Sequence, residues 1–203
     1  MAMARAPCFA QWESPELGRD FAADPARLAG DPRWAESGAR DVAEYARWAH
    51  HVCGMACVRM VLAARGLGAP PILELARAAT ARGAYVEEEG GTIRGMVYAP
   101  CVAWLREAWG IEAEVVVGID AHAIARTMER AAFFIASVHP SIRTPGQPPP
   151  RRGGHLVLVL EAGPDAIVFH NPSGFDEATR CGARLAPAEF DRFFAGRGIA
   201  IAR

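Results

Sequence analysis

The sequence predicts an α+β fold in which a helical N-terminal half packs on an antiparallel β-sheet. Two observations support this class. Between positions 53 and 110, apolar residues recur with the period of an α-helix. From position 132 onwards, strand-length runs rich in β-branched and aromatic residues replace that pattern. Helices followed by strands are typical of α+β proteins rather than of alternating βα units.

The first part of the chain, residues 1–45, is predicted to be an N-terminal arm, and residues 46–203 are predicted to form the main domain. Gly, Pro, Asp and Ser are dense in the arm, which favours turns and short helices. Trp12 and Trp34 are large apolar side chains within it. We therefore expect the arm to pack on the domain.

Three helices are expected in the helical half. The first begins near Cys53, where the apolar positions of 57–62 fall on one face before glycines end the helix. The second covers residues 70–83, with proline at its start and glycine at its end. A glycine-rich loop over residues 85–95 leads to the third helix, residues 98–110.

The second half is predicted to be mainly strands. We expect strands over residues 111–118, 132–139, 155–162, 166–172 and 198–203, and helices over residues 121–131, capped by Asp120, and 186–194. A Gly-Pro-Asp turn at 163–165 joins two of these strands as an antiparallel pair. Residues 143–154 contain too much Pro and Gly for regular structure.

Composition narrows the class of protein. The chain of 203 residues is 51% hydrophobic with a net charge of −1, and residues 150–154 are its one concentrated positive spot. Nucleic acid is therefore not expected as a partner. We find neither a signal-peptide core nor an apolar run of the ~20 residues that a bilayer requires, so no membrane partner is expected. Five scattered cysteines, an odd count, argue against a disulfide framework and predict a cytoplasmic protein with reduced thiols.

Cys53 is the first candidate for chemistry. A sulfur at the start of a helix lies beside first-turn amides that have no partner within the helix, and these amides and the helix dipole favour the thiolate. Gly54 would let a substrate approach the backbone closely. Such a nucleophile needs a base, which can come from a distant part of the sequence.

His155 is the candidate base, because it opens a predicted strand directly after two glycines. Asn171 follows sixteen residues later, at the end of the predicted partner strand. An antiparallel pair places the start of one strand beside the end of the next, so the two side chains can meet. An amide oxygen there would hold the imidazole in the tautomer that accepts a proton from Cys53.

Simpler interpretations apply to the remaining cysteines and histidines. We expect Cys57, Cys101 and Cys181 to be small core residues. We expect His50, His51 and His170 to be surface or structural residues, and His122 and His139 to lie on a helix surface and a loop edge. Zinc could be held by one histidine of residues 50–51 with Cys53 and Cys57, but further ligands at short spacing are missing from the sequence. No metal or other cofactor is therefore predicted.

Residues 53–62, residues 153–174, the short helix at 186–190 and the final strand together resemble the papain-like bacteriocin-processing cysteine peptidases, also called double-glycine leader peptidases. The resemblance covers roughly residues 48–203. It implies a papain-like fold with a central nucleophile helix and a peptide substrate. It also implies that Cys53 is the nucleophile, His155 the general base and Asn171 the residue that orients the base.

The sequence departs from that family at two places. Asn171 stands where Asp is commoner, so the hydrogen bond is kept without the charge. The family also uses a Gln shortly before the nucleophile as an oxyanion donor, but here positions 47–49 hold Arg, Trp and Ala. Gln11 is the sole upstream Gln, and an insertion of about 35 residues would reconcile the two patterns. Gln11 is thus the candidate oxyanion donor, the alternative being a plain surface glutamine.

Three functions remain open from the sequence. The first is a peptidase-like hydrolase that cleaves a peptide amide through a Cys-His-Asn triad and an acyl-enzyme. The second is an acyl or peptidyl transferase of natural-product tailoring that uses the same triad, and the third is a binding module with a degenerate site. A peptide or acyl substrate would lie in a groove whose wall includes the loop at 143–154. The substrate's identity and the oligomeric state are left open.

Overall fold

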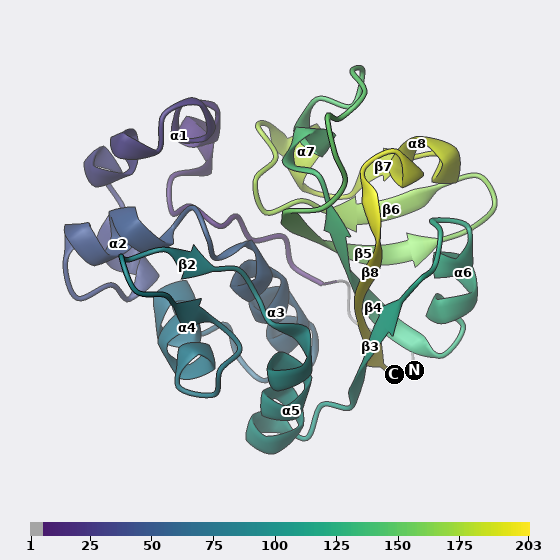
Figure 1. The fold of residues 1–203 in the computed structure, drawn as a ribbon, viewed down its shortest axis with the longest axis horizontal. Coiled ribbons are helices and arrows are strands. Elements are labelled where there is room, and N and C mark those ends of the chain that lie inside the picture. Colours follow the sequence, from purple (N-terminus) through teal and green to yellow (C-terminus); the bar gives the residue numbers. More distant parts are fainter. Residues whose placement is uncertain (1–5) are drawn as a thin grey trace.

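A computed structural model describes residues 6–203 of the chain. Figure 1 shows a group of helices beside a twisted antiparallel sheet, which confirms the predicted α+β class. No helix within the described residues is long and apolar enough to cross a membrane.

The main sheet has six strands in the order β3-β8-β4-β5-β6-β7, and each is antiparallel to its neighbours. Their bounds are β3 Ala113–Val117, β4 Ala131–Val138, β5 His155–Ala162, β6 Ile167–His170, β7 Ala183–Leu185 and β8 Phe194–Ala202. The predicted hairpin of β5 and β6 is present, with Leu158 opposite His170. This register sets which residues beyond the strand ends come close to each other.

Both faces of the sheet are covered by apolar side chains. Alternate residues of a strand point to opposite faces. On β4, Phe133 and Ile135 belong to the core shared with the helical half, whereas Phe134 and Ala136 belong to a second core on the other face. Every residue of β4 is buried as a result, which explains why its sequence is a continuous apolar run rather than an alternating one.

The helical half lies on one face of the sheet (Figure 1). Its helices are α3 Cys53–Ala64, α4 Ile72–Thr80 and α5 Tyr98–Trp109, close to the predicted ranges. The helices α6 Ala123–Met128 and α8 Pro187–Asp191 contribute Ile124, Met128 and Phe190 to the second core. α3 is buried along most of its length.

The structure differs from the sequence prediction at several elements. The expected loop over residues 85–95 contains a short hairpin, β1 Val86–Glu87 paired with β2 Ile93–Arg94. α6 begins at Ala123 rather than at 121, although Asp120 does accept the Ala123 amide at 2.9 Å. β7 and the four-residue helix α7 Glu177–Arg180 were not predicted, because segments this short carry no periodicity.

Short helices form most of the N-terminal arm: η1 Pro15–Leu17, α1 Gly18–Ala23, η2 Pro25–Gly30, η3 Trp34–Ser37 and α2 Val42–Trp48. Trp12, Phe21 and Leu28 belong to the same core as α3. Buried Asp31 organises the arm, because its carboxylate accepts the Ser14 hydroxyl at 2.6 Å and the Tyr45 hydroxyl. α2 extends across position 45, where the sequence suggested a boundary.

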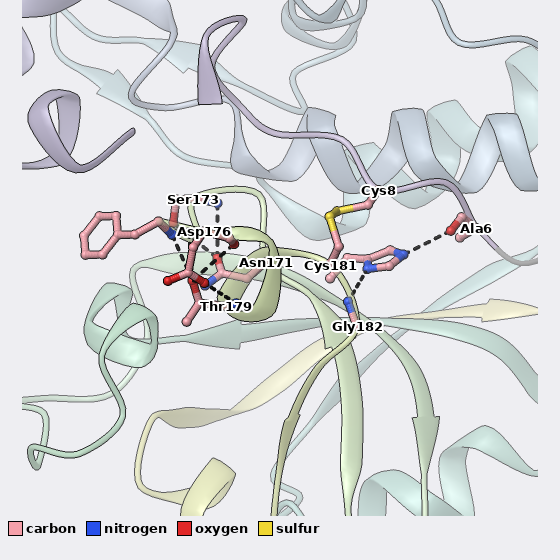
Figure 2. The surroundings of a disulfide bond; sticks show 10 residues. Ala6, Cys8, Asn171, Ser173, Asp176, Thr179, Cys181 and Gly182 are labelled. Atoms are coloured by element: carbon pink, nitrogen blue, oxygen red, sulfur yellow. Dashed lines mark hydrogen bonds between the residues drawn. A yellow bond between two sulfur atoms is a disulfide. The ribbon is translucent and has the colours of Figure 1, made fainter. Parts of the chain in front are cut away.

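A disulfide joins Cys8 to Cys181, with Cα atoms 5.6 Å apart (Figure 2). The prediction of five reduced thiols is therefore wrong for these two residues, and the interpretation of Cys181 as a core residue is wrong. Cys53, Cys57 and Cys101 are free. The two partners are 173 residues apart, so spacing in the sequence gave no sign of the pair. Disulfides persist in oxidising compartments, and the prediction of a cytoplasmic protein loses its main support.

The side chain of His170 forms two hydrogen bonds near the disulfide, accepting one and donating the other. Its Nδ1 accepts the Gly182 amide at 2.9 Å, so Nε2 carries the ring proton and donates it to the Ala6 carbonyl at 3.0 Å (Figure 2). The backbone N–H of Gln11 also donates a hydrogen bond to the Pro172 carbonyl at 2.9 Å. The segment of residues 6–12, called here the N-terminal strap, is thus fastened to the loop that follows β6.

Removing the disulfide should destabilise the fold. A cross-link across a long loop restricts the unfolded chain, so the double variant Cys8→Ser, Cys181→Ser is expected to lose about 2–5 kcal/mol of unfolding free energy. Urea unfolding followed by fluorescence measures this loss. Dithiothreitol should lower the urea midpoint of the natural protein and leave that of the double variant unchanged. Equal midpoints for the two proteins without reductant would show that the bond contributes nothing to stability.

Candidate active site

Cys53 lies at the first position of α3, as predicted, and its side chain is partly buried. Burial raises the pKa of its thiol above the usual value, while the backbone amides of Leu156 and Gly54 and the charge of Arg143 act in the opposite direction. Burial is the largest of these influences. The helix start therefore supplies donors for a thiolate without making the thiolate the resting form.

Gly54 has a role different from the one that the sequence suggested. A Cβ at this position would lie 2.5 Å from Met96 Cε and 3.0 Å from both Leu156 Cδ1 and the Tyr85 hydroxyl oxygen. The missing side chain therefore lets the start of α3 lie directly against β5 and the segment after β2. Gly54 allows a close contact between protein segments, and this contact brings Cys53 beside the beginning of β5.

His155 and Asn171 are in contact, as the predicted hairpin requires. His155 Nε2 lies 2.8 Å from Asn171 Oδ1. Both side chains are buried, with exposed fractions of 4% and 0%. Continuing the β5–β6 register beyond the end of β6 brings Ser173 opposite His155, and Ser173 Oγ lies 2.9 Å from His155 Nε2.

The hydrogen bonds around Asn171 define the tautomer of His155. Ser173 donates its backbone N–H to Asn171 Oδ1 at 3.2 Å. An N–H requires an acceptor, so the amide oxygen rather than the nitrogen faces this group. His155 Nε2 therefore donates its proton to the same oxygen. The basic nitrogen of the ring is Nδ1, which is the one a general base would use.

Arg143 is the charged residue of this group. Its Nε donates to Ser173 Oγ at 2.8 Å, and its guanidinium carbon lies 5.6 Å from the Phe175 ring centroid and 5.9 Å from that of Trp12. Burial lowers the pKa of Arg143. It forms no ion pair with any residue that the structure describes. Its positive charge therefore acts on the neighbouring histidine and cysteine without a counterion among the described residues.

His155 is neutral at ordinary pH. Burial is the main cause that lowers its pKa, to about 3, and the charge of Arg143 lowers it further, whereas the hydrogen bond that His155 donates to Asn171 partly opposes this decrease. Asn171 cannot offer the negative charge that an aspartate would supply. A neutral thiol beside a neutral imidazole is consequently the resting state of the pair.

Gln11 is buried, with 2% of its surface exposed, so the interpretation as a surface glutamine is wrong. Its Nε2 donates one hydrogen to the carbonyl of Ala49, four residues before Cys53, at 3.0 Å. Its backbone N–H donates a hydrogen bond to the carbonyl of Pro172, the residue after Asn171. The short helices of residues 15–48 form the insertion that separates Gln11 from α3. The structure thus brings Gln11 to the junction between the nucleophile helix and the loop of Asn171.

The other histidines are placed as follows. The ring centroid of His50 lies 6.4 Å from that of Trp12, and its Nδ1 is buried without a partner among the described residues. His170 has a structural role beside the disulfide. His122 is exposed and directly precedes α6. His139 Nδ1 accepts the backbone N–H of Ser141 at the start of η4 Pro140–Arg143. Within residues 6–203, no three His, Cys, Asp or Glu side chains gather as metal ligands.

Ser173 and Arg143 are the site residues that the sequence did not indicate. Ser173 lies two positions after Asn171, and the hairpin register could have revealed it. Arg143 lies in the proline-rich stretch for which no structure was expected, and it reaches the site because η4 directs it there. The sequence carries no signal of this placement.

A cleft of about 470 Å³ opens beside Cys53. Cys53 and His155 both line it, together with Arg94, Gly95, Met96, Val97, Tyr98, Ser137, Gly154, Leu156 and Arg197. One wall is the segment that follows β2, and the other is formed by the starts of β5 and β8 and the end of β4. A substrate in this cleft would meet the sulfur and the imidazole together.

Comparison with solved structures agrees with the resemblance seen in the sequence. The architecture is a papain-like α+β fold. The chain is similar to the peptidase domain of Streptococcus ComA, a bifunctional ABC transporter involved in a quorum-sensing pathway. The TM-score is 0.53 at 16% identity, over 75% of this chain and 92% of that domain. No protein-family profile and no curated protein matches the chain. The likeness therefore establishes the fold, and the chemistry depends on the site itself.

The pH dependence of alkylation tests the resting state of Cys53. Because the pKa of this thiol is raised, its reaction with iodoacetamide should accelerate steadily into the alkaline range, with a midpoint above the ~8.5 of a free cysteine. Mass spectrometry of the labelled peptide separates Cys53 from Cys57 and Cys101. A constant rate from about pH 5 to 8 would instead indicate a preformed thiolate–imidazolium pair.

Arg143→Gln should move this alkylation profile to higher pH, because the guanidinium lowers the pKa of Cys53. Arg126→Gln is the matched control, since Arg126 is exposed on α6, which packs on the second core. A profile that Arg143→Gln leaves unchanged would contradict the electrostatic role of this residue.

Proposed function

We propose that this protein is a cysteine peptidase-like hydrolase in which Cys53, His155 and Asn171 act as a triad. The observation that carries the proposal is the bond between His155 Nε2 and Asn171 Oδ1, which leaves Nδ1 basic on a residue that shares a cleft with Cys53. The likeness in fold to a peptidase domain supports a peptide amide as substrate.

In the first step, Cys53 Sγ attacks the carbonyl carbon of the substrate as its proton moves to His155 Nδ1. A C–S bond forms and the carbonyl π electrons become an oxyanion. Because the resting pair is neutral, the proton moves with the attack rather than before it. The C–N bond then breaks, the amine leaves with the proton from His155, and a thioester remains on Cys53.

Water completes the reaction by attacking the thioester. His155 Nδ1 takes a proton from the water, the C–S bond breaks, and the proton returns to the sulfur. An amine in place of the water would give acyl transfer with the same groups. Mass spectrometry of the products distinguishes a hydrolase from a transferase.

The oxyanion needs donors at the start of α3. The amide of Cys53 is one candidate, because first-turn amides have no partner within their helix. Gln11 Nε2 is the other candidate. Its hydrogen bond to the Ala49 carbonyl uses one of the two hydrogens on this nitrogen, so the second hydrogen is left for another acceptor. This bond also keeps the nitrogen rather than the oxygen of Gln11 directed towards residues 49–53. The proposal assigns the second hydrogen of Gln11 to the oxyanion.

Two substitutions, with one control, test the nucleophile and the oxyanion donor with a pool of internally quenched peptides. Cys53→Ala should abolish cleavage, and Gln11→Ala should lower kcat about 10²–10³-fold as expected for the loss of one oxyanion donor. His122→Ala, an exposed position, is the control. If Gln11→Ala leaves turnover intact while Cys53→Ala abolishes it, Gln11 is not the donor. Absence of cleavage by the natural protein would favour a binding module.

Ser173→Ala tests whether the group around His155 orients the base. The substitution removes the hydroxyl that contacts both Arg143 and His155, and kcat should fall about tenfold or more with little change in KM. Thr179→Ala is the matched control, because Thr179 caps α7 in the same loop without touching His155. An equal loss of kcat in both variants would show that loop order, and not orientation of the imidazole, is responsible.

A further inference from the structure

The cleft beside Cys53 is lined by two arginine side chains and by no described carboxylate. Arg94 comes from the end of β2 on one wall and Arg197 from β8 on the other wall. None of the described residues that line the cleft is Asp or Glu. Neither arginine has an ion-pair partner within residues 6–203. Both guanidinium groups are therefore available to an anion from outside the protein.

Arg197 lies close to the candidate catalytic residues. A Cβ built on Gly153, two residues before His155, would be 3.8 Å from Arg197 Nη2 and 3.3 Å from Ser137 Oγ. On the other wall, burial raises the pKa of Tyr98, and the neighbouring Ser137 and Arg197 lower it. A guanidinium and two hydroxyls thus converge near the base, which is a donor set suited to carboxylate oxygens.

In a second cleft of the molecule, arginine side chains form ion pairs with glutamates. It lies between α2 and α4 and includes Arg40, Arg47 and Arg77. There Glu44 pairs with Arg40 at 2.9 Å and Arg77 at 3.2 Å, and Glu87 pairs with Arg47. Arginines of that cleft are thus neutralised by the chain itself. The two arginines beside Cys53 therefore differ from those of the second cleft in having no carboxylate partner among the described residues.

We infer that the cleft binds a carboxylate of the substrate, and that the protein cleaves amides close to an acidic group. This inference rests on the function proposed above and adds its substrate class. The planar guanidinium of Arg197 matches a carboxylate in two-point geometry. A cationic or purely apolar side chain would be repelled by Arg94 and Arg197 or would desolvate them without compensation. The carboxylate belongs either to an Asp or Glu side chain or to the free C-terminus of a peptide.

Matched peptides test the inference. Internally quenched peptides with an acetylated N-terminus and an amidated C-terminus carry a single Glu or an isosteric Gln at each position around the scissile bond. A third series has a free C-terminal carboxylate and no Glu. We expect kcat/KM to be about tenfold higher for Glu than for Gln at one position, and this ratio to shrink at high salt. A preference found in the third series alone assigns the site to a C-terminal carboxylate.

Substitutions then locate the preference. Arg197→Gln should reduce the Glu-to-Gln ratio towards one, and Arg197→Glu should favour a Lys peptide instead. Arg94→Gln should also reduce the ratio, because Arg94 lines the same cleft. Arg126→Gln, on α6, is the matched control and should keep the ratio of the natural protein. A ratio near one in the natural protein, or one that Arg197→Gln does not change, overturns the inference while leaving the peptidase proposal intact.

Binding to the Cys53→Ala variant separates this inference from the proposed function. Fluorescence anisotropy with the most preferred Glu peptide should give about tenfold tighter binding than with its Gln counterpart, and Arg197→Gln should remove the difference. If no peptide is cleaved, a series of labelled Glu and Gln peptides still tests the cleft in this way. Selective carboxylate binding without cleavage would reject the peptidase and keep the site, whereas equal binding would reject the site.

Discussion

The site depends on the contact between the first turn of α3 and the beginning of β5. Gly54 makes this contact possible, since any Cβ there would meet Met96, Leu156 and the Tyr85 hydroxyl at 3.0 Å or less. All three atoms are the ends of side chains, so a larger residue at position 54 would force these side chains to move or repack. The absence of a side chain at Gly54 thus favours the close approach of α3 to the sheet. Cys53 precedes this glycine and Leu156 follows His155, so one contact fixes both halves of the proposed pair.

The N-terminal strap holds the opposite side of the same arrangement. Gln11 bonds Ala49 of the helical half and Pro172 of the sheet half, and the Cys8–Cys181 disulfide secures the strap beside them. Asn171 is tied into the same loop, because its backbone N–H donates a hydrogen bond to the carbonyl of Arg180, the residue before Cys181. Gln11, the candidate oxyanion donor, and Asn171, the proposed orienting residue, thus share one support. The long insertion after Gln11 folds into helices of its own and leaves this support intact.

How much the sequence could predict depends on the range of each interaction. Helical periodicity predicted α3, and the hairpin pattern predicted that His155 would meet Asn171, because both are local signals. The disulfide between Cys8 and Cys181 could not be predicted, since the pairing depends on how the strap crosses the sheet. Arg143 was missed for a related reason, because its position depends on a short 3-10 turn in a proline-rich stretch. The resemblance to a known family indicated Gln11 as a candidate, and only the fold brought it next to Pro172.

The charges of the site link the proposed mechanism to the inferred substrate. In the proposed mechanism, attack by Cys53 turns His155 into an imidazolium, but Asn171 offers no negative charge and Arg143 opposes the new positive one. The protein itself would therefore destabilise the charged form of the proposed base. A carboxylate bound by Arg197 would lie in the cleft that His155 also lines and would partly offset this penalty. On this view, an acidic substrate contributes to catalysis as well as to binding, because it supplies the charge that an aspartate in place of Asn171 would provide. The discrimination between Glu and Gln peptides would then appear in kcat as well as in KM.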